Sequence, residues 1–67
     1  MKEKLERVIA ALEVEAAMIE LHAQRLLEMV PSLAGDEQRR EMLQLVKEET
    51  DRAEAIKRQI RLLQDHL

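Results

Sequence analysis

The sequence predicts an all-α protein, an antiparallel two-helix hairpin that dimerises into a four-helix bundle. Leu, Ala, Glu, Lys and Arg account for 41 of the 67 residues, and Gly and Pro occur once each. This composition is typical of long helices. Apolar residues recur at alternating intervals of three and four, which is the heptad spacing of helices that pack in pairs. One break divides this pattern in two, so we expect a single hairpin domain over residues 1–67.

The first helix is expected over residues 2–30. Its apolar residues follow one another without a slip in the heptad spacing, and we call this row the inner seam of the helix. The row consists of Leu5, Ile9, Leu12, Ala16, Ile19, Ala23, Leu26 and Val30.

The loop is expected over residues 31–36. Pro31 disfavours helix at the residue before it, and Gly35 suits a left-handed turn position. Asp36 is a good N-cap for the next helix, with Ser32 as the rival. Arg39 occupies the place where a capping box would have Glu or Gln, so no capping box is expected.

The second helix is expected over residues 37–66, and its inner seam continues the same spacing. The row consists of Met42, Val46, Glu49, Ala53, Ile56, Ile60, Leu63 and Leu67. Because the connection is short, the helices must run antiparallel. Apolar residues then face apolar residues at every level except one, where Ile19 lies opposite Glu49.

The first helix carries a second apolar row on its opposite face. This outer stripe consists of Ala11, Val14, Met18 and Leu21, and Ala10 and Ala17 lie beside it. The matching face of the second helix is polar, with Gln44, Asp51, Arg58 and Asp65. A helix that is apolar on both sides belongs inside a larger bundle. We therefore expect the outer stripe to be an interface, either with a second copy in a two-fold dimer or with a partner helix.

Glu49 defines a polar layer in the inner seam. A lone buried carboxylate is costly, so Glu49 should be paired or should coordinate an ion. Arg52 follows it by three residues, and the antiparallel register brings Glu15 near Arg52. The first interpretation is a Glu15–Arg52–Glu49 ion cluster that fixes the register. The alternative is a carboxylate metal site, with His22 one turn away.

The residues Glu15 to Leu27 and Met42 to Ile60 resemble the helix pairs of ferritin-like and rubrerythrin-like proteins. The resemblance is carried by Glu15, His22 and the segment from Lys47 to Glu54. It implies that Glu15 and Glu49 bind iron or another divalent metal, in a site that encapsulated ferritin-like proteins complete across a dimer. Arg52 stands where the family has a histidine ligand, so His22 would have to substitute for it.

Rop-type plasmid regulators resemble the chain in architecture, as hairpins of similar length that dimerise into four-helix bundles and bind RNA. Here basic and acidic residues alternate along the second helix, the formal net charge is −3, and no aromatic residue is present. Nucleic-acid binding needs a basic face. We therefore expect no nucleic acid as a partner.

Composition also argues against several other functions. The chain has no Cys, and its Ser and Thr residues have no His and Asp arranged beside them as in a catalytic triad. It has no apolar run of the ~20 residues that cross a membrane. We expect a cytoplasmic protein that is not an enzyme, has no cofactor and functions by protein–protein interaction as a scaffold, chaperone or regulator. The alternative is a ferritin-like half-bundle that binds metal at an oligomer interface.

Overall fold

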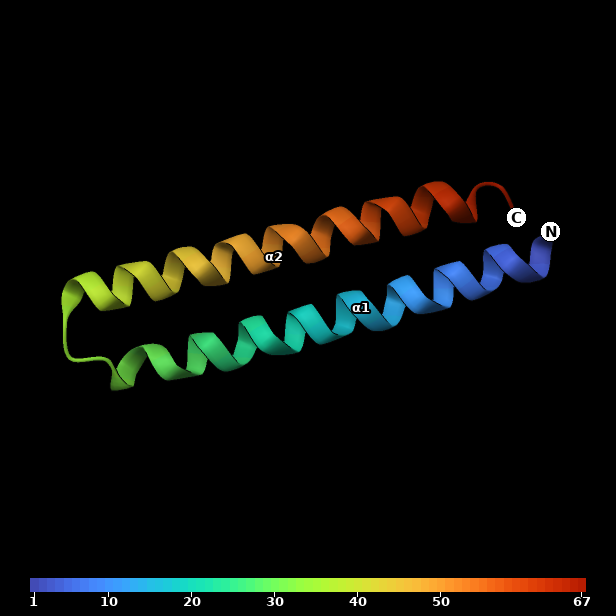
Figure 1. The fold of residues 1–67 in the computed structure, drawn as a ribbon. Coiled ribbons are helices and arrows are strands. Elements are labelled where there is room, and N and C mark those ends of the chain that lie inside the picture. The colour runs from blue at the N-terminus through green and yellow to red at the C-terminus, as the bar shows by residue number, and fades with distance from the viewer.

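Two long helices lie side by side and run in opposite directions (Figure 1). A computed structural model describes all residues from Met1 to Leu67. Helix α1 spans Lys2–Met29, a short 3₁₀ helix η1 spans Val30–Ser32, and helix α2 spans Asp36–Gln64. There is no strand, and the two chain ends meet at the end of the hairpin opposite the loop. The predicted all-α antiparallel hairpin is confirmed.

The core consists only of residues from the predicted inner seams. The six buried residues are Ile9, Ala16, Ile19, Ala23, Ala53 and Ile60. The other seam residues are half-buried, apart from Leu67, which is exposed at the end of the chain. Half of the buried residues are alanines, and small side chains let two helix axes approach closely. The heptad pattern therefore identifies correctly which face of each helix is buried.

The connection differs from the prediction in its details. Gly35 has φ −96° and ψ 141°, an extended conformation, and no residue has a positive φ. The expected left-handed glycine is therefore wrong. Gly35 is itself the N-cap of α2, and Asp36 is the first helical residue rather than the cap. Pro31 lies within η1, whose first turn needs no N–H from proline.

Arg39 stabilises this connection in place of a capping box. Its guanidinium donates a hydrogen bond to the Leu33 carbonyl oxygen at 2.6 Å and also pairs with the carboxylate of Asp36. One side chain thus satisfies a loop carbonyl and joins the first turn of α2 to the residues before it. α2 starts at Asp36 and ends at Gln64, close to the predicted range of 37–66.

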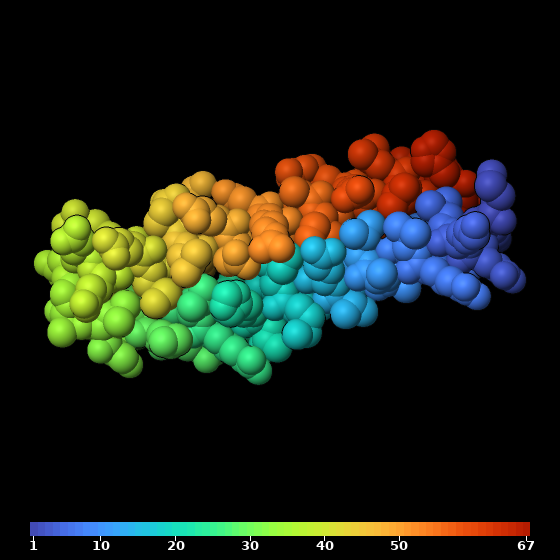
Figure 2. Space-filling view, viewed as in Figure 1, coloured from blue at the N-terminus to red at the C-terminus, as the bar shows by residue number.

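The molecule is a thin rod rather than a sphere (Figure 2). Its principal extents are 52 × 14 × 10 Å, and its radius of gyration is 15.6 Å. A spherical domain of this length would have a radius of gyration of roughly 11 Å. Neither helix has an apolar stretch long enough to span a lipid bilayer.

Candidate interaction surface

The outer stripe lies open on α1. The exposed fraction is 63% for Val14, 62% for Met18 and 41% for Leu21, and Ala11 is also exposed. On the same helix, Ile9, Ala16, Ile19 and Ala23 are buried against α2. The middle of α1 is therefore apolar both on the face that α2 covers and on the face that nothing covers.

The outward face of α2 is polar and is satisfied within its own helix. Lys47 pairs with Asp51 at 3.0 Å, and Gln44 donates a hydrogen bond to Glu48 at 3.3 Å. Both are contacts between residues four apart on an exposed helix surface, which stabilise a helix modestly and leave it hydrated. This face needs no partner, so the hairpin presents one uncovered apolar helix and one hydrated helix.

The polar layer forms around Glu49, whose side chain is 17% exposed. One carboxylate oxygen lies 3.6 Å from Nδ1 of His22, and the other lies 3.7 Å from a guanidinium nitrogen of Arg52. Glu15 is exposed and forms no ion pair. The prediction that Glu15 belongs to the cluster with Arg52 and Glu49 is therefore wrong. Arg52 turns to Glu49 because that carboxylate is one turn away on the same helix, and His22 supplies the contact across the helix pair.

The residues named for a metal site are brought together only in part. His22 and Glu49 are in contact, and Glu15 lies outside the pair. No group of three or more His, Cys, Asp and Glu side chains is close enough within one hairpin to hold a metal ion.

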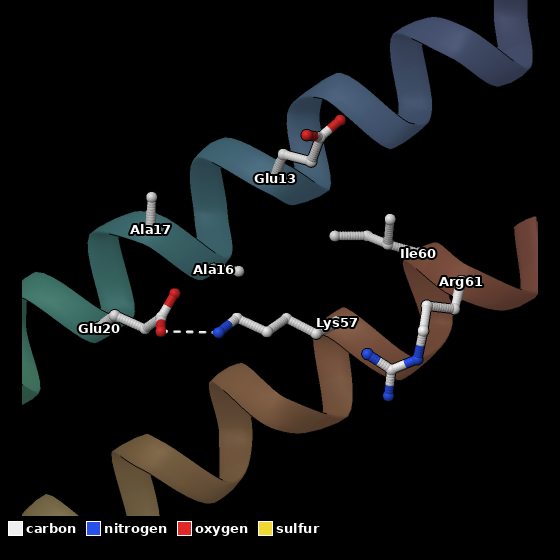
Figure 3. A pocket seen from close by; sticks show the side chains of 7 residues that line it. All are labelled: Glu13, Ala16, Ala17, Glu20, Lys57, Ile60 and Arg61. Carbon is white, nitrogen blue, oxygen red and sulfur yellow. Dashed lines mark hydrogen bonds and ion pairs between the residues drawn. The ribbon is translucent and has the colours of Figure 1, made fainter. Parts of the chain in front are cut away.

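An open groove of about 320 Å³ runs along one side of the helix pair (Figure 3). Its lining residues are Glu13, Ala16, Ala17, Glu20, Lys57, Ile60 and Arg61. Nζ of Lys57 lies 2.7 Å from a carboxylate oxygen of Glu20 on α1 and 3.6 Å from Glu54 on its own helix. The hydrogen bond with Glu20 is the main cause that raises the pKa of Lys57 above its ordinary value of 10.5. This charged pair spans the groove and links the two helices.

The residues predicted from the sequence include neither this link nor the apolar residues that flank the seam near the loop. Leu27, Met29, Leu43 and Leu45 are all exposed there. The signal was available, because positions directly beside a heptad seam are the ones that meet across an antiparallel helix pair. Glu20 and Lys57 hold such flanking positions with opposite charges.

Comparisons with protein-family models, curated proteins and solved structures found no match.

Proposed function

We propose that this chain is a protein–protein association module, a scaffold, chaperone or regulator that works through the outer stripe. The observation that carries the proposal is the exposure of Val14, Met18 and Leu21 on a helix whose opposite face is already buried. An apolar row at helical spacing is the pattern by which helices recognise one another. The charges along α2 are mixed in sign and the net charge is −3, which favours a protein partner over nucleic acid.

The small core supports the same proposal. Only 6 of the 67 residues are buried, and the chain has no Cys with which to form a disulfide. Folding leaves 5318 Å² exposed, which means that it buries a little over half of the roughly 11,000 Å² of the unfolded chain. A domain of this size normally buries about 60%. Association is one of the routes by which so short a chain gains stability.

The proposed role is binding rather than catalysis. Most polar contacts of the hairpin are exposed pairs on helix surfaces, and its grooves are open to solvent, whereas catalytic sites are enclosed clefts. We place the protein in the cytoplasm, since a chain without cysteine suits a reducing compartment.

The test is to replace Met18 and Leu21 with glutamate together and to measure the assembly by analytical ultracentrifugation. We expect the double variant to sediment as a monomer and to lose much of its helical circular dichroism, because the isolated hairpin has so small a core. Leu62→Glu is the matched control, since Leu62 is 66% exposed on α2 and should be neutral. A double variant that keeps the parent's assembly size and helicity would show that the outer stripe is not the interface.

A second candidate is a metal-binding half-bundle of ferritin-like type, completed by another chain. The contact between His22 and Glu49 favours it, because imidazole and carboxylate are both metal ligands. This candidate predicts a rise in melting temperature with Fe²⁺, Mn²⁺ or Zn²⁺ that is lost in Glu49→Gln. An unchanged melting temperature with all three ions would count against it.

A further inference from the structure

We propose that a second copy of this chain occupies the outer stripe, in an antiparallel two-fold dimer whose four helices form a flat layer in the order α2–α1–α1–α2. The two-fold axis passes beside Met18. This inference rests on the proposed function, because it takes the outer stripe to be the interface, and it adds the identity of the partner and the arrangement of the dimer.

The hairpin exposes more surface than a monomer of its mass normally does, and this excess is close to the area that one protomer would bury in such a dimer. A monomeric protein of 7.8 kDa exposes roughly 4,400 Å². The hairpin exposes 5318 Å², an excess of about 900 Å². A stable protein–protein interface of standard size buries about 800 Å² on each partner. One additional contact with an identical surface would therefore bring the exposed area to the level expected for the mass.

The direction of the outer stripe favours a layer over a square bundle. Successive residues of an α-helix are rotated by about 100°, so the outer stripe points about 150° away from the inner seam of α1. In a square bundle each helix contacts its two neighbours at about a right angle, and both helices of the hairpin would need such a second apolar face. α2 lacks one, since its outward Gln44 and Asp51 are engaged in polar contacts within the helix. α1 therefore lies between α2 and the partner's α1.

Charge complementarity selects the antiparallel direction. With the axis beside Met18, Val14 faces the partner's Leu21, and Arg7 lies at the level of the partner's Glu28. Within one chain Arg7 forms no ion pair, and the only contact of Glu28 is a weak hydrogen bond from Gln24 at 3.5 Å. A parallel dimer would instead place Arg7 beside the partner's Arg7 and align the two helix dipoles, both of which are unfavourable.

The absence of cysteine makes the direction directly testable, because any introduced cysteine is unique in the chain. In the antiparallel dimer only a residue at the axis meets its own copy. We expect Met18→Cys to form an interchain disulfide under mild oxidation and Ala11→Cys to remain reduced. Efficient crosslinking of both variants would indicate a parallel dimer and would overturn the inference.

The layer is tested by spin labels on Asp51→Cys, which lies on the outward face of α2. Three interhelical spacings separate the two α2 helices in the layer, or roughly 24–30 Å, against one spacing along the edge of a square bundle or about 1.4 spacings across its diagonal. Suppose that the spin labels report a short α2–α2 distance and that Met18→Glu/Leu21→Glu still dissociates the dimer. This result would overturn the layer and leave the proposed function standing. A monomeric parent would overturn the second copy as partner, and a dimer insensitive to the double substitution would overturn the proposed function itself.

Discussion

Ala53 is the most buried side chain of the hairpin, with an exposed fraction of 1%. Ala16, on the facing seam of α1, is exposed by 3%. Alanine loses almost no side-chain entropy on burial and leaves the two backbones close together. The middle of the hairpin is therefore a tight contact between small residues, and the larger buried residues Ile9, Ile19 and Ile60 lie on the same seams.

We expect Ala53→Leu to destabilise the hairpin by about 1–3 kcal/mol, because a larger side chain at a close-packed position forces the helices apart. The change is measured by urea denaturation followed by far-UV circular dichroism. Ala55→Leu is the matched control, since Ala55 is exposed two residues later on the same helix and Leu has nearly the same helix propensity. Equal free energies of unfolding for the two variants would show that the helices are not in close contact at Ala53.

The ion pair between Lys57 and Glu20 predicts how stability depends on pH at the alkaline end. Because the folded state raises the pKa of Lys57 above 10.5, the pair contributes its full stability below that value. The contribution is lost as the pH rises through the folded-state pKa. The pair is exposed, so the effect is small and weakens with salt.

We therefore expect Lys57→Met to lower the urea midpoint at neutral pH. Above about pH 10, the midpoint of the variant should fall less with rising pH than that of the parent. Urea midpoints measured across this range check the prediction. Lys2→Met serves as the control, because Lys2 forms no ion pair. A Lys57→Met variant whose midpoint falls with pH as steeply as that of the parent would contradict the assigned role.

At the polar layer, the sequence predicts correctly that a polar contact forms around Glu49 but does not predict all of the residues that take part in it. The pairing of Glu49 follows from its place in an apolar heptad row, and the structure confirms the pairing, although the side chain is only partly buried. The choice between Glu15 and His22 as the contact from α1 depends on side-chain rotamers, which a heptad pattern does not contain. The contact of Arg39 also depends on its rotamer. From the sequence, Arg39 only rules out a capping box, whereas in the structure its guanidinium reaches back to the Leu33 carbonyl.

Among the elements, the helices follow from periodicity and the connection follows from local geometry. The spacing of apolar residues determines both helices and their buried faces, because one inserted residue would rotate the rest of the row by about 100°, away from the partner helix. The conformation of Gly35, in contrast, does not follow from the sequence. Glycine tolerates a left-handed turn and also an extended N-cap, so its presence alone does not distinguish the two. The structure has the extended form, with φ −96°.

This geometry predicts that Gly35→Ser stabilises the hairpin by roughly a few tenths of a kcal/mol. Serine adopts the extended conformation without strain, and its hydroxyl can accept a hydrogen bond from a free N–H in the first turn of α2, which has no side-chain cap at present. Only Gln38 lies near the added Cβ, at 3.6 Å or more, so there is space. Thermal unfolding of the variant provides the measurement, and Gly35→Ala separates the effect of the hydroxyl from that of the Cβ. A clear loss of stability in Gly35→Ser would indicate a left-handed residue instead.

At the scale of the whole molecule, the hairpin has more surface than its mass warrants and a core of only six residues. Several of its charged groups form ion pairs within or between the helices, and an uncovered apolar row lies along the middle of α1. The sequence already indicates this imbalance, because one helix has two apolar faces and the other has one. What covers the outer stripe is a property of the assembly, so the pattern of a single chain leaves a second copy and a foreign helix both open.

Self-association through the outer stripe can be measured by native mass spectrometry of the unmodified chain, with and without a chelator, which needs none of the aromatic absorbance that this chain lacks. We expect a dimer whose mass is that of two chains without metal and which the chelator leaves unchanged. A stable monomer at micromolar concentration would contradict self-association through the outer stripe. A dimer carrying stoichiometric metal that the chelator removes would instead favour the ferritin-like half-bundle.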